Sequence, residues 1–211
     1  MSAFRRRLVE STQSDSGLRA KLRRVRVFAA IFPPDDAVDD LAEITVPMQQ
    51  MYPDLRWAQP PLWHLTLAYF GNITQADQGQ LNRAVASFVA ERETLRVRLV
   101  GAGTFSEPNV AQTLWAGVDS QQDALLHLSG DLVTAVQHFG WTLDRRSFRA
   151  HLTLARAQPG RDLLPLVDQL SDYTGPFWDV PSIAVVWARQ AEDGEPVYEL
   201  LGEHTFTPPE R

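Results

Sequence analysis

The spacing of apolar residues predicts that strands and helices alternate along the chain, in a similar order in its two halves. Runs of β-branched, aromatic and leucine side chains indicate strands, and apolar positions three or four apart indicate helices. The predicted strands are 26–32, 62–70, 95–100, 113–118, 148–155, 183–188 and 197–201. The predicted helices are 35–51, 74–91, 121–139 and 161–171.

A short motif occurs twice at matching places in these two halves. The letters HLTLA stand at 64–68 and again at 151–155. Each histidine follows an aromatic residue of its own opening strand by 36 positions, namely Phe28 for His64 and Trp115 for His151. The repeat predicts two lobes built on one plan and related by a pseudo-twofold axis. One HLTLA strand from each lobe would then line a shared cleft.

The two motifs pair an imidazole with a hydroxyl. In a strand, residues i and i+2 point to the same face, so His64 lies beside Thr66 and His151 lies beside Thr153. Imidazole has an ordinary pKa of about 6.5, so one histidine can accept a proton while the other donates one. Threonine hydroxyls can donate hydrogen bonds to phosphate oxygens. These four residues are therefore candidates for phosphoryl chemistry without a metal.

Arginines gather around the second motif. Arg156 ends the same predicted strand, and Arg149 lies two positions before His151, on the same strand face. Arg145 and Arg146 form a further small basic cluster. Because a guanidinium can bind two phosphate oxygens at once, Arg156 and Arg149 are candidate phosphate ligands.

Aromatic side chains near the motifs are candidates for stacking on a nucleobase. They are Phe148, Trp57 and Tyr69, although strand alternation places Tyr69 on the face of Leu65 and Leu67 and so predicts that it packs in the core. The remaining histidines have no comparable context, and we expect no catalytic role for His127, His138 and His204.

Composition narrows the classes of ligand and location. The 211 residues carry a net charge of −6 and no cysteine, which excludes disulfides and cysteine chemistry. Residues 1–26 hold eight basic and two acidic side chains, so the remaining chain is strongly acidic. A long nucleic acid gripped through many phosphates needs a basic surface, whereas a small anion in a local pocket does not. We expect 1–24 to be a flexible extension, with a short basic helix at 18–24, and 25–211 to form one bilobal domain.

No apolar run reaches the roughly 20 residues that a membrane span needs, and no apolar segment follows the arginines at 5–7 as in a signal peptide. A cytoplasmic location is therefore expected. We also expect a monomer, because one chain supplies both motifs.

The sequence resembles the 2H phosphoesterases, and among them the RNA 2′,3′-cyclic phosphodiesterases, also called LigT-like 2′–5′ RNA ligases. The resemblance covers about 25–207 and is carried by RVFAAIFPP, LRWAQPPLWHLTLAYFG and RSFRAHLTLAR. It implies a bilobal α+β fold, with antiparallel sheets flanking a central cleft and helices outside. The departures are Leu62 and Trp63 where a polar residue often precedes the first motif, and Ala150 where proline is frequent.

The resemblance also implies a reaction. A 2′,3′-cyclic phosphate at an RNA 3′ end is opened to a 2′-phosphomonoester without metal or cofactor, and 2′–5′ ends can be joined in reverse. By this likeness His64 protonates the leaving 3′ oxygen and His151 activates water. Thr66 and Thr153 complete the two motifs, and Arg156 matches the basic residue that follows the second one.

Of three alternatives to this function, one remains open and two are disfavoured. Related families act on ADP-ribose 1″,2″-cyclic phosphate or 2′–5′ oligonucleotides, and an acidic body suits a small nucleotide equally well. A non-catalytic RNA-end-binding module has no need of both intact His-x-Thr pairs. A metallohydrolase is disfavoured because the chain lacks His-x-His and His-Glu-x-x-His patterns, and no glycine-rich nucleotide-binding motif is present.

Overall fold

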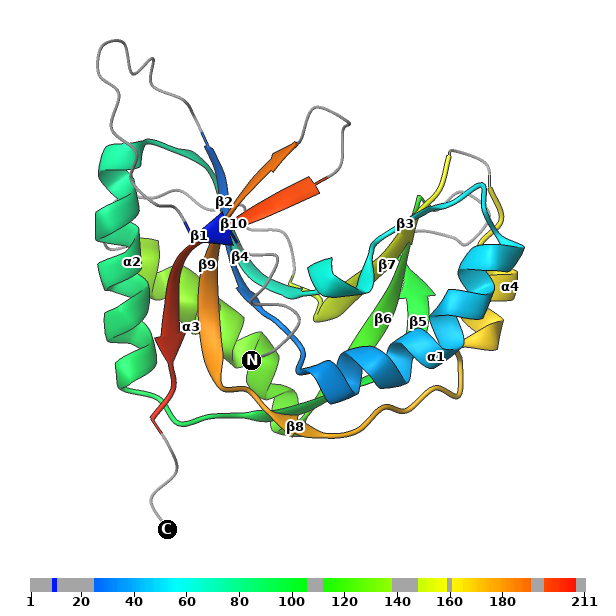
Figure 1. Cartoon of the computed structure of the whole chain (residues 1–211). Helices are drawn as coiled ribbons and strands as arrows, with labels where there is room; N and C mark the ends of the chain where they lie inside the picture. Colours follow the sequence, from blue (N-terminus) through cyan, green and yellow to red (C-terminus); the bar gives the residue numbers. More distant parts are fainter. Residues whose placement is uncertain are drawn as a thin grey trace.

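The computed structural model describes residues 9–10, 25–105, 112–137, 148–158, 161–190 and 196–207. Its strands join one curved sheet in the order β1-β10-β9-β2-β4-β7-β6-β5-β8, and β3 pairs with β7 off this path (Figure 1). Every pairing is antiparallel except that of β1 with β10. The architecture is therefore mixed α+β, as the sequence predicts.

The elements follow the predicted order with shifted ends. The strands are β1 (Val9–Glu10), β2 (Val25–Ile31), β3 (Arg56–Trp57), β4 (Leu65–Ile73), β5 (Arg96–Thr104), β6 (Thr113–Ser120), β7 (His151–Arg156), β8 (Trp178–Asp179), β9 (Ser182–Gln190) and β10 (Pro196–Thr205). The helices are α1 (Asp35–Met51), α2 (Gln75–Ala90), α3 (Ala124–Gln137) and α4 (Leu164–Gln169), with short 3₁₀ helices η2 (Pro60–Leu62) and η3 (Gln121–Asp123).

Two predicted strands begin later than expected. The strand predicted at 62–70 starts at Leu65, because prolines at 60 and 61 begin the 3₁₀ helix η2 instead. The strand predicted at 148–155 starts at His151. The sequence did not predict β1, which lies within the stretch expected to be flexible; the rest of 1–24, including the helix at 18–24, lies outside the described residues.

Helix α2 shows how local sequence sets an element boundary. Thr74 precedes its first turn, and its hydroxyl accepts a hydrogen bond from the backbone N–H of Asp77 at 3.3 Å. The Asp77 carboxylate in turn accepts from the backbone N–H of Thr74 at 3.4 Å. This reciprocal capping box satisfies donors that the first turn would otherwise leave unpaired. It begins the helix directly after β4, which continues through Gly71 and Asn72 to Ile73.

Each end of the sheet is covered by one helix from each half of the chain. Helices α1 and α4 lie beside β5 and β6, and α2 and α3 lie together near β9 and β10 (Figure 1). Tyr173, just after α4, donates a hydrogen bond to Asp40 of α1 at 2.7 Å. Ser129 of α3 donates to the Leu67 carbonyl of β4, also at 2.7 Å. The two ends of the sheet are therefore not consecutive pieces of chain.

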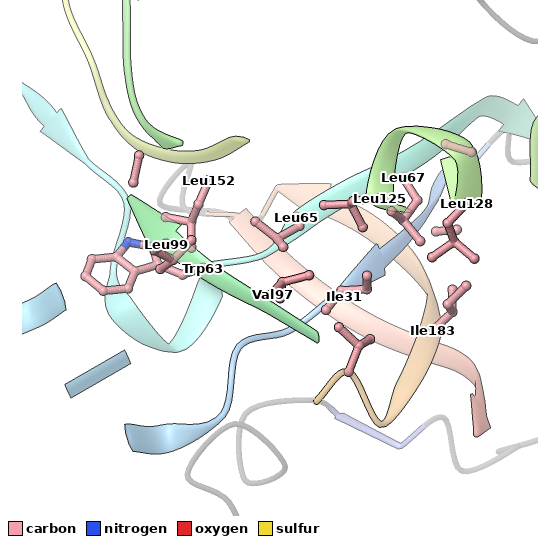
Figure 2. Close-up of a cluster of buried hydrophobic side chains, with 14 of the residues drawn as sticks. Ile31, Trp63, Leu65, Leu67, Val97, Leu99, Leu125, Leu128, Leu152 and Ile183 are labelled. Atoms are coloured by element: carbon pink, nitrogen blue, oxygen red, sulfur yellow. The ribbon is translucent and has the colours of Figure 1, made fainter. Parts of the chain in front are cut away.

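The two HLTLA strands meet at the centre of the sheet. Strands β4 and β7 pair through a single register position, Leu65 opposite Leu152. Both leucines are almost fully buried and belong to one hydrophobic cluster that continues through both ends of the sheet (Figure 2). Burial of a leucine side chain stabilises a fold by roughly 1.5–3 kcal/mol. His64 directly precedes Leu65, and His151 directly precedes Leu152. The packing of the two leucines therefore holds the two histidines close to each other.

None of the helices in the described part of the chain is long and apolar enough to cross a membrane.

Candidate active site

Both motifs open onto the same pocket. A cavity of about 380 Å³ is lined by the two histidines, the two threonines and Arg156. With Trp57, which also lines it, the pocket therefore brings together six of the nine candidate site residues. The remaining lining residues are Arg56, Trp57, Ala58, Gln59, Leu62, Pro196 and Tyr198. Among the described residues that line the pocket there is no aspartate or glutamate, and Arg56 and Arg156 give this lining a positive charge although the chain has a net negative charge.

The two histidines are held in the same way. The Nδ1 atom of His64 lies 2.9 Å from the Leu62 carbonyl oxygen, and that of His151 lies 2.7 Å from the Arg149 carbonyl oxygen. A carbonyl oxygen can only accept, so each Nδ1 carries a proton and donates it. The second ring nitrogen, Nε2, is then the atom that can exchange a proton with a ligand.

Aromatic rings contact each imidazole. Phe28 lies 4.9 Å from His64 and Trp115 lies 6.5 Å from His151, measured between ring centroids. These are the two residues that precede the histidines by the same interval in the sequence. Tyr198 meets His64 edge-on at 5.3 Å, and Phe105 meets His151 edge-on at 4.7 Å. The rings limit both the orientation and the hydration of the imidazoles.

This burial favours the neutral form of both imidazoles. Desolvation lowers the pKa of His64 to about 4, and the nearby His151 adds a smaller lowering effect. Desolvation also lowers the pKa of His151, with further lowering by the charges of Arg156 and Arg149. A bound phosphate would oppose these effects, because an anion favours the charged imidazolium. The two imidazoles are therefore neutral bases, and a bound anion would favour their protonation by solvent.

A β-bulge directs Arg156 towards the pocket. Strict alternation would place Arg156, five positions after His151, on the opposite face of β7. Strand β6 pairs Leu114 with Ala155 but Trp115 with Thr153, which leaves Leu154 as an extra residue. The bulge reverses the alternation, so Arg156 is exposed on the pocket side and donates a hydrogen bond to the Thr113 hydroxyl at 3.4 Å.

A family model for the 2′-5′ RNA ligase superfamily matches residues 33–192. The chain belongs to this superfamily. Among its relatives, a protein of Geobacillus stearothermophilus named RNA 2′,3′-cyclic phosphodiesterase is 29% identical over 139 residues, which are 66% of this chain and 44% of that protein. A protein of Aeropyrum pernix with the same name is 26% identical over 168 residues, or 78% of this chain and 90% of that protein.

The fold is also that of a solved member of the superfamily. The crystal structure of E. coli LigT complexed with 3′-AMP superposes with a TM-score of 0.67 at 19% identity, covering 87% of this chain and 99% of that one. The predicted LigT-like α+β fold is thereby confirmed.

A matching bulge in β4 exposes Tyr69 but does not bring it into the pocket lining. Tyr69 follows His64 by five positions, as Arg156 follows His151. Strand β2 pairs Ala30 with Thr66 but Ala29 with Ala68, so Leu67 is the extra residue. Tyr69 is consequently 48% exposed, and the expectation that it packs in the core is wrong. It is also absent from the pocket lining, so its position does not support a contact with a ligand there.

Two candidate substrate-binding residues, Arg149 and Phe148, are absent from the pocket lining. The Arg149 guanidinium lies 5.7 Å from the ring centroid of Trp115, and its backbone carbonyl orients His151. Phe148 is half-buried and packs against the main core. Arg149 therefore supports His151 and Phe148 contributes to the core, whereas Trp57 does line the pocket.

The other predicted residues are placed as follows. His127 is exposed on α3, and His204 of β10 contacts the Asn82 side chain at 3.1 Å; neither lines the pocket. His138, Arg145 and Arg146 lie outside the described residues. Sequence reasoning missed Arg56, Gln59, Pro196 and Tyr198: the first two lie in the stretch that carries the family resemblance but outside its His-x-Thr pair, and the last two come from the distant strand β10.

The side chains of the pocket suit a phosphate better than a metal ion. Within the described ranges, no group of three or more histidine, cysteine, aspartate or glutamate side chains could hold a metal. The described residues that line the pocket include two imidazoles and no carboxylate. A catalytic zinc typically takes three protein ligands of these kinds.

Proposed function

We propose that this protein is an RNA 2′,3′-cyclic phosphodiesterase that opens a terminal cyclic phosphate to a 2′-phosphomonoester. The observation that carries the proposal is the convergence of two His-x-Thr pairs on one cationic pocket. Relatives that match 66% and 78% of the chain bear the name of this activity.

The phosphate would lie between the two motifs. The Thr66 and Thr153 hydroxyls donate to its non-bridging oxygens, and the Arg156 guanidinium offsets its negative charge. Donors that are already in place before the reaction stabilise charge that develops on these oxygens in the transition state. The rigid strands β4 and β7 carry both motifs and hold these donors in position.

The two histidines then transfer protons in opposite directions. His151 Nε2 accepts a proton from water as the water oxygen forms a bond to phosphorus. The bond between phosphorus and the 3′ oxygen breaks, and His64 Nε2 donates its proton to that oxygen. Each general acid or base contributes roughly 10²–10⁴ in rate.

This division of roles comes from the family likeness, and the electrostatics are consistent with it. Burial lowers the pKa of His64 to about 4. When a bound anion favours its charged form, His64 takes up a proton from solvent, and an imidazolium of low pKa is then a strong acid towards a leaving oxygen. The charges of Arg156 and Arg149 help to lower the pKa of His151, so His151 is neutral and can act as the base.

The size of the pocket limits the substrate to the end of a nucleic acid. A cavity of about 380 Å³ accommodates about one nucleotide, and the acidic body offers no extended basic surface for a long chain. The related LigT has been crystallised with 3′-AMP. The protein would act on RNA 3′ ends as a monomer in the cytoplasm. With the 5′ hydroxyl of a second RNA in place of water, the same residues can catalyse a related transfer, in which that oxygen bonds to phosphorus, the 3′ oxygen leaves and a 2′–5′ linkage forms.

Phosphorus NMR of the product tests this function. The purified protein is incubated with a short RNA ending in a 2′,3′-cyclic phosphate, in the presence of EDTA. We expect the cyclic phosphate signal to be replaced by that of a 2′-phosphomonoester. A 3′-phosphate product would contradict the proposed geometry, and no turnover would contradict the RNA-end function.

Parallel reactions with ADP-ribose 1″,2″-cyclic phosphate and a 2′–5′ dinucleotide address the small-nucleotide alternative, which the small pocket and the acidic body also fit. Turnover of one of these substrates in preference to the RNA would favour that alternative. Binding of the RNA end without turnover of any substrate would indicate a binding module.

A further inference from the structure

An exposed aromatic ring contacts His151 from outside the pocket. The ring of Phe105, directly after β5, lies edge-on to the imidazole with 4.7 Å between centroids, yet Phe105 is 50% exposed and does not line the pocket. Tyr198 makes the corresponding edge-on contact with His64 and does line the pocket. Single exposed apolar side chains are common, but this one lies against the histidine that the proposed mechanism uses as the base. Phe105 therefore presents an apolar surface beside the pocket rather than inside it.

Packing around Trp115 fixes the position of Phe105. The two rings lie 5.9 Å apart between centroids, and Trp115 also contacts His151 and the Arg149 guanidinium. Gly103 is the register partner of Trp115 on β5, and a Cβ atom there would lie 2.5 Å from the indole. The indole is thus held against β5, and Phe105, two residues beyond Gly103, lies on the same face of the strand. We refer to Phe105 and Trp115 as the aromatic platform.

The sheet places the aromatic platform on the side of His151 that faces away from His64. Strands β4, β7, β6 and β5 follow one another in the sheet. His64 directly precedes β4, and His151 begins β7. Trp115 lies on β6, and Phe105 follows β5. A ligand that contacts both histidines would therefore reach the aromatic platform only by extending past His151.

The geometry of displacement at phosphorus limits what such a ligand can be. The attacking and leaving oxygens lie roughly in line, on opposite sides of the phosphorus atom. With His64 at the leaving 3′ oxygen and His151 at the attacking oxygen, the group that carries the attacking oxygen lies on the side of the aromatic platform. A water molecule needs no apolar surface there. The 5′ hydroxyl of an RNA brings a ribose and a base, and unpaired RNA bases stack on aromatic side chains.

We propose that Phe105 stacks on the 5′-terminal nucleobase of a second RNA, whose 5′ hydroxyl then attacks the cyclic phosphate in place of water. This inference rests on the proposed cyclic phosphodiesterase function and assigns a site to its acceptor. The 5′ oxygen bonds to phosphorus as His151 Nε2 takes its proton, the bond from phosphorus to the 3′ oxygen breaks, and His64 Nε2 protonates the 3′ oxygen. The product is a 2′–5′ phosphodiester. Because every base has an aromatic face, the aromatic platform should accept all four bases.

Competition between two acceptors tests the aromatic platform. One is 2′,3′-O-isopropylideneadenosine and the other is methyl 2,3-O-isopropylidene-β-ribofuranoside, so each has only its 5′ hydroxyl free and the base is what distinguishes them. Both compete for one RNA ending in a 2′,3′-cyclic phosphate, and mass spectrometry measures the ratio of the two transfer products. We expect the wild type to favour the nucleoside by roughly tenfold, which corresponds to about 1.4 kcal/mol and lies within the range for stacking of one base.

Three variants show whether this preference comes from Phe105. In Phe105→Ala the ratio should fall to near one, and Phe105→Tyr should keep it, because tyrosine retains the aromatic face. Phe177→Ala is the matched control and should keep the wild-type ratio, since Phe177 is 40% exposed, lies beside the guanidinium groups of Arg96 and Arg98, and does not line the pocket. A change in the reactivity of His151 alters both products equally, so the ratio reports the acceptor site. A wild-type ratio near one, or a ratio that Phe105→Ala leaves unchanged, would overturn the inference.

Fluorine NMR separates this inference from the proposed function, because binding needs no turnover. The protein carries 4-fluorophenylalanine in place of Phe105, and excess adenosine 2′-monophosphate fills the pocket. A saturable shift of the fluorine signal with the adenosine derivative, and not with the methyl riboside, would support the aromatic platform. If no cyclic phosphate were opened, that result would stand while the function was contradicted. Hydrolysis without transfer to either acceptor, or no shift of the fluorine signal, would contradict the acceptor site alone.

Discussion

Each histidine of the pocket is prepared by its immediate neighbours. A backbone carbonyl two positions earlier in the chain fixes the proton on Nδ1, and an aromatic residue 36 positions earlier contacts the ring. The two histidines were predictable because both motifs and their equal intervals from Phe28 and Trp115 can be seen directly in the sequence, but the contacts of these two rings with the imidazoles were not predicted. The sequence could not predict Tyr198 or Arg56, whose relation to the histidines exists only through the pairing of distant strands.

The lowered pKa values predict an acidic optimum for the reaction. The value of kcat/KM reports the ionisation of the free enzyme. The acid His64 loses its proton as pH rises through its pKa of about 4, and the base His151 gains one as pH falls through its own lowered pKa. Because both pKa values lie below 6.5, kcat/KM for a cyclic phosphate should be highest below pH 6.5 and fall towards pH 8. A maximum above pH 7 would show that burial does not control these groups.

At the scale of the element, irregular pairing decides which side chains reach the pocket. Strict alternation predicts the faces of His64, Thr66, His151 and Thr153 correctly, since these residues precede the bulges in β4 and β7. It fails for Tyr69 and Arg156, which follow the bulges. A bulge depends on the register of the partner strand, so the amino-acid pattern of one strand does not reveal it.

A glycine in β5 makes room for an aromatic ring beside the second motif. A Cβ atom at Gly103 would lie 2.5 Å from the Trp115 ring, the ring that contacts His151 and Arg149. We expect Gly103→Ala to lower the free energy of unfolding by about 1–3 kcal/mol, because the indole must move in a packed environment. Chemical denaturation measures this change.

Gly130→Ala is the control for that substitution. Gly130 is exposed in α3, and a Cβ atom there would meet nothing within 4 Å. Alanine should stabilise the helix at this position by about 0.5–1 kcal/mol. Equal stability changes for the two alanine variants would show that the space beside Trp115 is not limiting.

At the scale of the whole molecule, the two motifs are held together by elements exchanged between the halves of the chain. The order of strands and helices was largely predictable from apolar spacing. The end of the sheet at which each helix packs was not predictable. Helix α1 follows β2 but lies beside β5 and β6, and α3 follows β6 but lies near β9 and β10. Side-chain contacts such as that of Tyr173 with Asp40 record this exchange.

That contact should contribute measurably to global stability. The Tyr173 hydroxyl donates to the Asp40 carboxylate at 2.7 Å, and burial together with this bond raises the pKa of Tyr173. A hydrogen bond to a charged group contributes roughly 1.5–3 kcal/mol, so Tyr173→Phe should destabilise the protein by about that amount. A double-mutant cycle with Asp40→Asn isolates the pair, and a coupling energy near zero would contradict this account.

Loss of either pocket histidine is the most direct test of the central claim that His64 and His151 act together as acid and base. The measurement is kcat/KM for an RNA ending in a 2′,3′-cyclic phosphate, with His64→Ala, His151→Ala and the double variant. His127→Ala serves as the control, because His127 is exposed on α3 and does not line the pocket. We predict that each pocket variant loses roughly 10²–10⁴ in kcat/KM, that the double variant loses little more, and that His127→Ala matches the wild type. Near wild-type turnover by a folded His64→Ala or His151→Ala protein would contradict the two-histidine mechanism.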